Sequence, residues 1–533
     1  MTSAPSIAHA FEHVAARYGK RAFLKDKRDG AWIDFSWTDI VAATRRLRGG
    51  LLKMGLAPGD RVAILAENCP EWVIVDLAVL GMGGVVVPLY PTSSAEEIAH
   101  VLGDSATRAI AVRGSENLSK VAQLASGLPG LEAIIAVRCD APPPPVGGAR
   151  PFVTSLESLS GPDEAGLAEV GHSDVATIIY TSGTTGASKG VVLTHGNILA
   201  NSEASQAALD LDDRDLTLSF LPVAHSFERT AGYYTVMTAG GTIAYAEGLG
   251  QIAQNLLEVN PTIVLTVPRL LEVIHSRVLR TVEKSAPVRR RLFDLAVATG
   301  QRAANYRFHG RAVPPHLALP MAVFRKLVFA RIRSLFGTRL RYLISGGAPL
   351  PREIFEFFSA AEVPIAEGYG LTEASPVVSV NLLGRTRPGS VGQPLKGLEA
   401  KLAADDELLI RGASVMKGYY GLEDDTRQAI DAEGWLHTGD IAAIDAEGYI
   451  SIRDRKKEII VLSGGKNVSP AGLEAKLARE PLVAQACVVG DRRKHLAALL
   501  VPDFERLAET LKREGIEANS PQTLVEEPKV KAL

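Results

Sequence analysis

Short runs of hydrophobic, mostly β-branched residues alternate along the chain with longer segments in which hydrophobic residues recur every three or four positions. Runs such as "RVAIL", "TIIY", "TIVLTV" and "RYLIS" have the length and composition of buried strands. Segments such as "WTDIVAATRRLRGGLLKMG" and "SSAEEIAHVLGD" have the helical period instead. This alternation predicts an α/β fold with buried, mostly parallel sheets.

The pattern changes after "GWLHTGD" at residues 434–440. Short strands and turns ("AAIDAEGYISIRDRKKEIIVLSGGKNVSP") are followed by one helical segment, "AGLEAKLAREP", and one more strand, "QACVVGD". We therefore predict a large N-terminal domain over residues 1–453 and a small C-terminal α+β domain over residues 454–533. The proline-rich segment 141–151 is predicted to be a loop, because the same α/β pattern continues on both sides of it.

Composition excludes several classes of protein. The 58 Lys and Arg residues nearly balance the 60 Asp and Glu residues, so no overall charge favours nucleic acid as a partner. The three cysteines lack CxxC spacing, which argues against a disulfide framework or a thiolate metal site and fits a cytoplasmic protein. No signal peptide is recognised, and the most hydrophobic stretch, "DLAVLGMGGVVVPLY", falls short of the about 20 residues that span a bilayer.

The segment "YTSGTTGASKG", residues 180–190, has the composition of a phosphate-binding loop. Glycines let backbone N–H groups approach a phosphate chain, hydroxyls add donors, and a lysine supplies positive charge. It is not a Walker A loop, because Ser188 precedes Lys189 and Gly190 follows it. A surface turn is the alternative for any loop of this composition, but the preceding strand and the order of residues favour phosphate binding.

The order "TSGTTGxxKG" resembles the phosphate loop of the adenylate-forming enzymes, which include acyl-CoA synthetases, luciferases and peptide-synthetase adenylation domains. Further segments follow in the order typical of that family: "FLPVAHSFER" (220–229), "SGGAPL" (345–350), "EGYGLTEASP" (367–376), "GWLHTGD" (434–440) and "DRKKEIIVLSGGKNVSP" (454–470). The similarity is strongest to the long-chain fatty acyl-CoA synthetase branch. It implies an acetyl-CoA synthetase-like fold, with layered α/β sheets and a distorted β-barrel in the large domain and a mobile small domain.

The resemblance implies that a medium- to long-chain fatty acid is joined to AMP and then transferred to coenzyme A. ATP, coenzyme A and the acid would be substrates, and Mg²⁺ the expected cofactor. Two alternatives stay open: a fatty acyl-AMP ligase that delivers to a carrier protein, and a non-catalytic nucleotide or acyl-CoA sensor. The acyl-AMP ligases usually carry an inserted segment before the small domain, and none is found between Gly418 and Asp454.

The resemblance also gives roles to individual residues. The candidate catalytic residues are Lys189, His225, Thr372 and Glu373. The implied ATP- and AMP-binding residues are Thr181, Ser182, Gly183, Thr184, Thr185, Gly186, Lys189, Gly346, Gly347, Ala348, Pro349, Glu367, Gly368, Tyr369, Gly370, Thr372, Asp440 and Arg455. Glu373 and Thr184 are the implied Mg²⁺ ligands. Tyr369 is expected to stack on adenine.

Other matched positions concern movement and the acyl chain. Lys457 matches the hinge of the small domain, and Gly465 matches a glycine that lines the coenzyme A tunnel. Ala231 and Gly232 leave room for an acyl tunnel, although close helix packing explains them equally well. His225 matches the residue that gates the carboxylate pocket, and a purely structural histidine is the alternative.

The end of the chain departs from the family pattern. Lys529 and Lys531 lack the Gly/Thr surroundings of the family's terminal lysine motif, so we expect a truncated small domain or a weakened adenylation step. Between Arg277 and Arg333, many Arg and Lys residues are interleaved with Leu, Phe and Val. This stretch is either a solvated helical face or a surface for peripheral association with the inner face of the membrane. The sequence also leaves the oligomeric state open, a homodimer included.

Overall fold

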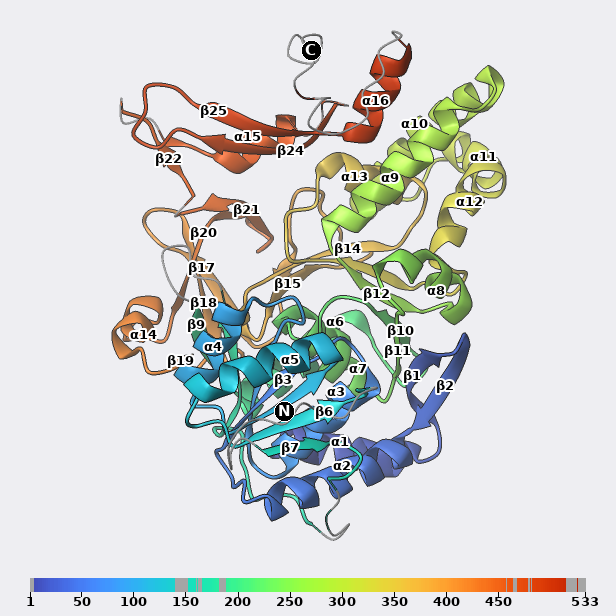
Figure 1. Cartoon of the computed structure of the whole chain (residues 1–533). Coiled ribbons are helices and arrows are strands. Elements are labelled where there is room, and N and C mark those ends of the chain that lie inside the picture. The colour runs from blue at the N-terminus through green and yellow to red at the C-terminus, as the bar shows by residue number, and fades with distance from the viewer. Residues whose placement is uncertain are drawn as a thin grey trace. The chain divides into compact units, whose positions relative to one another are not determined.

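The computed structural model describes residues 4–139, 152–159, 161, 165–181, 188–456, 458–463, 467–477, 480, 482–513 and 525 (Figure 1). The chain divides into two compact units. The larger comprises Met1–Lys401, Leu409–Thr438 and Ile444–Ser451, and the smaller comprises Leu402–Leu408, Gly439–Ala443 and Ile452–Leu533.

One sheet of the larger unit has nine strands in the order β16-β15-β14-β13-β12-β10-β11-β1-β2. The strands are β1 (Ala22–Arg28), β2 (Ala31–Ser36), β10 (Leu216–Ser219), β11 (Thr242–Tyr245), β12 (Ile263–Thr266), β13 (Tyr342–Ser345), β14 (Ile365–Gly370), β15 (Val377–Asn381) and β16 (Gln393–Pro394). The strands from β14 to β1 pair in parallel. Their carboxyl ends therefore share one edge, where the segments after β10, β13 and β14 begin.

A second sheet has eight strands in the order β19-β9-β8-β4-β3-β5-β6-β7. The strands are β3 (Arg61–Leu65), β4 (Val85–Leu89), β5 (Ala109–Arg113), β6 (Ala133–Val137), β7 (Phe152–Ser155), β8 (Val175–Thr181), β9 (Lys189–Thr194) and β19 (Gly418–Tyr419). The strands from β8 to β7 pair in parallel, whereas β9 and β19 are antiparallel to their neighbours. The predicted strands "RVAIL" and "TIIY" are confirmed as β3 and part of β8.

The larger unit also contains helices, several of which pack on these sheets (Figure 1). They are α1 (Ile7–Tyr18), α2 (Trp37–Lys53), α3 (Pro70–Gly81), α4 (Ala95–Asp104), α5 (Ser115–Leu124), α6 (His195–Leu209), α7 (Thr235–Ala239), α8 (Ile252–Val259), α9 (Pro268–Glu283), α10 (Pro287–Phe308), α11 (Pro315–Phe324), α12 (Ala330–Arg333), α13 (Arg352–Ala360) and α14 (Glu423–Ala429). The predicted helix "SSAEEIAHVLGD" is confirmed as α4. It begins with a capping box between Ser94 and Glu97, which satisfies two of the free N–H groups at its start.

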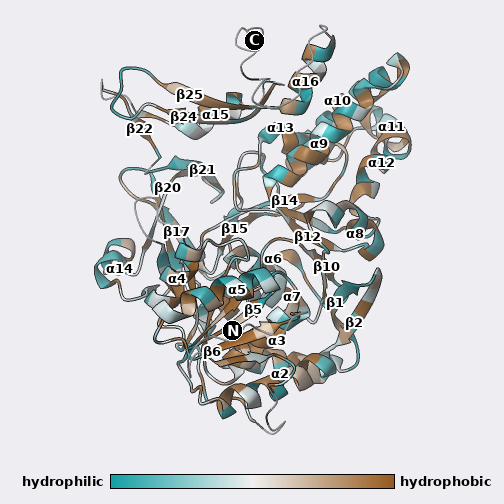
Figure 2. Ribbon diagram, in the orientation of Figure 1, coloured by the Kyte–Doolittle hydropathy of each residue, from teal (hydrophilic) through white to brown (hydrophobic). Residues whose placement is uncertain are grey.

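The two large sheets each have a hydrophobic core. In the nine-stranded sheet, Leu218, Val264 and Leu343 pack with aromatic residues of the covering helices, including Phe357. In the eight-stranded sheet all five residues of β6 are buried, and Figure 2 shows how strongly hydrophobic residues dominate that strand. Such continuous hydrophobic strands are typical of parallel sheets covered on both faces.

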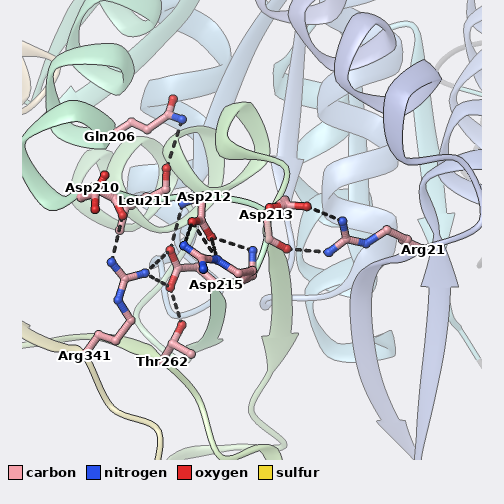
Figure 3. A network of polar contacts seen from close by, with 10 residues as sticks. Arg21, Gln206, Asp210, Leu211, Asp212, Asp213, Asp215, Thr262 and Arg341 are labelled. Carbon is pink, nitrogen blue, oxygen red and sulfur yellow. Dashed lines mark hydrogen bonds and ion pairs between the residues drawn. The ribbon is translucent and has the colours of Figure 1, made fainter.

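Polar contacts tie together the amino ends of three strands of the nine-stranded sheet (Figure 3). Arg341, directly before β13, donates from Nη1 to both carboxylate oxygens of Asp215 at 2.8 Å. Thr262, directly before β12, donates to Asp215 Oδ1 at 2.8 Å. Asp215 itself directly precedes β10 and is 2% exposed. This network therefore holds the amino ends of β10, β12 and β13 together. The segments that carry the candidate site residues begin at the opposite edge, at the carboxyl ends of the strands.

A further four-stranded sheet has the order β17-β18-β20-β21. These strands are β17 (Leu398–Leu402), β18 (Glu407–Gly412), β20 (Leu436–Ile444) and β21 (Ile450–Arg455). The boundary between the two units passes through this sheet. The smaller unit continues with β22 (Ile460–Val461), β23 (Asn467–Val468), α15 (Pro470–Leu477), β24 (Val483–Val489), β25 (Ala497–Pro502) and α16 (Phe504–Arg513).

Candidate active site

The glycine-rich segment connects two paired strands. Thr181 at the end of β8 lies opposite Lys189 at the start of β9. Several predicted site residues lie outside the residues that the structure describes: Ser182, Gly183, Thr184, Thr185, Gly186, Lys457 and Gly465. A Cβ on Gly190 would lie 2.6 Å from a side-chain carbon of Ile178, so close packing with β8 explains that glycine.

Lys189 is held from two sides. Its Nζ forms an ion pair with Asp425 on α14, and it lies 5.4 Å from the centre of the Tyr419 ring. The side chains of Lys189 and Asp425 are 37% and 33% exposed, so solvent weakens their attraction. An anionic ligand at this place could therefore replace Asp425 at little cost.

Tyr419 links Lys189 to a second motif. Its hydroxyl donates to Glu373 Oε1 at 3.0 Å. Burial, and then the negative charge of Glu373, raise the pKa of Tyr419, so the hydroxyl keeps its proton. Glu373 belongs to the 3₁₀ turn η6 (Thr372–Ala374), which begins two residues after β14. The structure thus brings together two residues that were predicted separately, through a tyrosine that was not predicted.

Thr372 contacts the segment after β10. Its Oγ1 lies 3.0 Å from Ser226 Oγ, and both residues are buried. The neighbouring His225 is exposed, and its Nδ1 accepts a hydrogen bond from Phe227 N at 3.1 Å. The segment that carries His225 therefore lies next to the predicted α-phosphate contact.

The residues Gly346 to Pro349 follow β13 at the same sheet edge. A Cβ on Gly346 would lie 2.9 Å from Cζ of Phe227, so this ring requires a glycine there. Gly347 has φ +79°, a left-handed conformation that glycine adopts without strain. Gly347, Ala348 and Pro349 are exposed, whereas Gly346 is buried.

β14 carries four of the predicted nucleotide-binding residues. Glu367 is 8% exposed, and burial raises its pKa to about 7. Its Oε1 accepts a hydrogen bond from Leu350 N at 3.1 Å. Gly368 and Tyr369 are partly buried on the same strand. A Cβ on Gly370 would lie 2.1 Å from a backbone oxygen of the following turn, so only glycine fits.

Ala231 and Gly232, the predicted acyl-tunnel residues, lie in a π-helical segment, η2 (Glu228–Tyr234). A Cβ on Gly232 would lie 2.7 Å from Cδ of Glu228, so the carboxyl group of Glu228 occupies the space beside this glycine. Ala231 is partly buried and packs in a neighbouring hydrophobic cluster. Their role in an acyl tunnel stays a prediction.

Asp440 and Arg455 belong to the smaller unit and contact each other. Arg455 Nε donates to Asp440 Oδ1 at 3.2 Å, and the Asp440 side chain is 4% exposed. The residue before Asp440 on β20 is also fixed, because Gly439 N donates to Glu407 Oε1 at 2.9 Å. Lys456 Nζ lies 3.0 Å from the other oxygen of Glu407. A buried carboxylate held on strand β20 suits the predicted contact with ribose hydroxyls.

In the part of the chain that the structure describes, no three His, Cys, Asp or Glu residues are grouped to hold a metal ion by themselves. Mg²⁺ does not need such a group, because it is often bound by one or two carboxylates together with substrate phosphates. Glu373 provides a carboxylate that is partly exposed and oriented by Tyr419. Its oxygen donors therefore fit the implied ion.

Residues 11–420 match the family described as AMP-binding enzyme, and residues 457–528 match the AMP-binding enzyme C-terminal domain. A long-chain-fatty-acid–CoA ligase, FadD15 of Mycobacterium bovis, is 36% identical over 488 residues, which are 90% of this chain and 78% of that protein. The peroxisomal long chain acyl-CoA synthetase 6 of Arabidopsis thaliana is 32% identical over 557 residues, covering 98% of this chain and 77% of that protein.

Solved structures share the fold. The anthranilate CoA ligase AuaEII in complex with anthranoyl-AMP superposes with a TM-score of 0.74 at 20% identity, covering 96% of this chain and 90% of that chain. A Mycobacterium tuberculosis fatty acyl CoA synthetase superposes with a TM-score of 0.67 at 23% identity, covering 98% and 90%. These similarities confirm the predicted mixed α/β architecture with a large N-terminal and a small C-terminal part.

Proposed function

Because the chain belongs to the family of AMP-binding enzymes, we propose that it is an ATP-dependent fatty acid–CoA ligase. It activates a medium- to long-chain fatty acid as an acyl-adenylate, releases pyrophosphate, and transfers the acyl group to coenzyme A with release of AMP. Curated relatives that are 30–36% identical over most of the chain carry the name of this activity. The chain-length range is our expectation from the sequence resemblance.

The observation that carries the proposal is the contact of Lys189 and Glu373 with the same tyrosine. The ring of Tyr419 lies under Lys189, and its hydroxyl donates to Glu373. The lysine of the hairpin formed by β8 and β9 and a carboxylate of η6 therefore share one site. The first step joins two anions, a fatty carboxylate and the α-phosphate of ATP. Lys189 would neutralise part of that charge, and Thr372 would hold the α-phosphate in line for attack.

Glu373 and Thr184 would hold Mg²⁺, which when bound neutralises negative charge on the phosphate oxygens. The remaining assignments concern the nucleotide. Tyr369 would offer a flat face to adenine. Asp440 would accept the ribose hydroxyls, and Arg455, which donates to Asp440, would contact the ribose or a phosphate.

For the second step we propose that the small domain, residues 454–533, turns about Lys457 so that coenzyme A reaches the adenylate past Gly465. A glycine at that tunnel position would leave the channel unobstructed. The acyl chain would lie near Ala231 and Gly232, and each buried CH₂ would contribute about 0.8 kcal/mol. Replacement Gly232→Leu should then shorten the preferred acid, although it should also lower the overall rate because its Cβ would lie 2.7 Å from Cδ of Glu228. Unchanged chain-length selectivity would remove this assignment.

We also propose that the enzyme is cytoplasmic and associates peripherally with anionic membrane. In the described ranges, every helix is too short or too polar to cross a bilayer. The segment from α9 to η4 (Arg325–Phe329) exposes large hydrophobic residues, namely Val273, Val288, Leu295, Leu319, Val323 and Leu327. Arg289, Arg290 and Arg291 are exposed near the start of α10, where the helix dipole disfavours positive charge, and of the three Arg290 donates to Ser285 O at 3.2 Å.

This association predicts binding to vesicles that contain phosphatidylglycerol, with loss of binding at high salt. The triple replacement of Arg289, Arg290 and Arg291 by Glu should abolish pelleting with these vesicles. Purely zwitterionic vesicles serve as the control for charge. A wild-type chain that stays in the supernatant at low salt would refute the association.

The ligase proposal is tested by acid-dependent exchange between ATP and radiolabelled pyrophosphate, measured over acids of increasing length. We expect exchange with fatty acids in the absence of coenzyme A, and AMP release that requires coenzyme A. Exchange with no coenzyme A-dependent AMP release would favour the acyl-AMP ligase. Absence of both activities would favour a non-catalytic sensor.

A further inference from the structure

Glu228 is a buried carboxyl group at the start of η2. It is 2% exposed, and burial raises its pKa to about 8, against the opposing effect of a hydrogen bond with Ser219. Its Oε2 has no hydrogen-bond partner in the described part of the chain. Ionisation without a compensating partner is costly in such surroundings, so the uncharged acid is the form that fits.

The backbone around Glu228 is shaped to hold this carboxyl group. A Cβ on Gly232 would lie 2.7 Å from both Cδ and Oε1 of Glu228, so the group packs directly on the glycine backbone. The segment is π-helical, a conformation that is rare and often occurs at functional sites. The position of Glu228 therefore depends on two local features, a glycine and a π-helical turn.

Glu228 also connects to the segment that carries His225. Its partner Ser219 ends β10 and accepts a hydrogen bond from Asn68 Nδ2 at 2.9 Å. The same Asn68 nitrogen donates to Leu221 O at 2.7 Å, and Asn68 Oδ1 accepts from Val223 N at 2.9 Å. The turn 220–227 is thus held through Asn68 and Ser219 on one side and through Glu228 on the other.

The charged groups around this turn do not compensate a Glu228 carboxylate. Arg229, the next residue, is buried in an ion pair with Asp76 and donates to Tyr234. Tyr245 on β11 shares the surroundings of Glu228 and stays neutral, because burial raises its pKa well above the usual value. Because Arg229 is already paired with Asp76, an ionised Glu228 would have no positive partner here and would have to move toward water.

We propose that Glu228 is a positioning residue for the adenylation step: in its uncharged form it fixes the turn that carries His225 and Ser226. Ionisation would draw the carboxyl group away from Gly232 and loosen this turn. Ser226 contacts Thr372, the predicted α-phosphate contact, so the displacement would reach the reacting groups. The inference rests on the proposed ligase function for its kinetic consequence only.

The kinetic test is acid-dependent ATP–pyrophosphate exchange without coenzyme A, measured from pH 6 to pH 10. The wild-type rate should fall above about pH 8 and approach a tenfold loss per pH unit. Glu228→Gln, which cannot ionise, should retain the neutral-pH rate and lose the alkaline fall. Glu228→Ala should lose roughly tenfold or more at pH 7, and Glu353→Gln, on the surface of α13, should behave as the wild type.

An alkaline fall in Glu228→Gln equal to that of the wild type would overturn the proposal, as would full exchange by Glu228→Ala at pH 7. Absence of exchange in the wild type would instead refute the ligase function. A stability measurement tests the protonation state of Glu228 independently of catalysis. Since the folded-state pKa of Glu228 lies above the unfolded value, the wild type should lose stability relative to Glu228→Gln between about pH 4.5 and pH 8. A constant difference across this range would refute the uncharged buried acid.

Discussion

Replacement Tyr419→Phe removes one hydroxyl group from the contact between the phosphate hairpin and η6. The ring stays beneath Lys189, at 5.4 Å from Nζ, so the cation–π contact is preserved. What is lost is the 3.0 Å hydrogen bond to the Glu373 carboxylate. A hydrogen bond to a charged group is worth about 1.5 to 3 kcal/mol, and Tyr419 is only partly buried, so we adopt the lower end. The expected loss in kcat/KM for adenylation is therefore roughly tenfold.

Pyrophosphate exchange measures this loss, and equilibrium binding of ATP shows whether it arises in the ground state. Tyr420→Phe is the matched control, because Tyr420 is the next residue and packs against Gly190 rather than Glu373. Phe at position 419 should also leave the unfolding midpoint nearly unchanged. If Tyr419→Phe exchanges pyrophosphate within twofold of the wild type, the orientation of Glu373 by Tyr419 is not part of catalysis.

Three further predictions concern charge. Lys189→Met should lower the exchange rate by roughly 10² to 10³, and a fall below threefold would contradict its role at the phosphates. Asp76→Asn should destabilise folding by about 3 to 5 kcal/mol in urea unfolding, because it leaves Arg229 buried without its counter-ion. Glu356→Gln, which affects an exposed pair, should cost under about 0.5 kcal/mol, and equal effects of these two replacements would refute the argument. Burial raises the pKa of Glu367 from 4.5 to about 7, so its folded form binds a proton more tightly than its unfolded form. The wild type should therefore lose stability relative to Glu367→Gln as pH rises from 4.5 to 7, by about 3 kcal/mol in total, and a pH-independent difference would be contrary evidence.

The sheet architecture could be predicted because buried parallel strands and amphipathic helices have different hydrophobic periods. "RVAIL" and "TIVLTV" contain β3 and β12, and "SSAEEIAHVLGD" contains α4. The period does not report which strands are neighbours, so the pairing of β9 with β19 could not be foreseen. That pairing brings Tyr419 to Lys189, which explains why the tyrosine in "MKGYY" was missed.

The candidate site was predicted by motif rather than by contact. Lys189, Glu373 and Thr372 were singled out as residues, but their partners Tyr419, Asp425 and Ser226 lie on segments far away in sequence. The motif also does not explain Gly346 fully. The bound nucleotide was the expected neighbour, whereas in the structure the Phe227 ring already requires a residue without Cβ.

Buried polar groups were the hardest to predict, because a sequence gives no burial for a single charged residue. In the sequence, Asp76 and Glu228 are both single acidic residues within helical segments, and nothing distinguishes their environments. In the structure Asp76 has an arginine and two tyrosine hydroxyls, whereas one oxygen of Glu228 has no partner among the described residues. Their hydrogen-bond partners therefore differ for reasons that only tertiary packing supplies.

The central claim is that the hairpin between β8 and β9 binds the polyphosphate of ATP. It is tested most directly by a crystal structure with a non-hydrolysable ATP analogue. We predict that the β- and γ-phosphates lie against residues 181–189 and that Lys189 has exchanged Asp425 for a phosphate oxygen. Phosphates bound at another place, with the ion pair between Lys189 and Asp425 intact, would contradict the account.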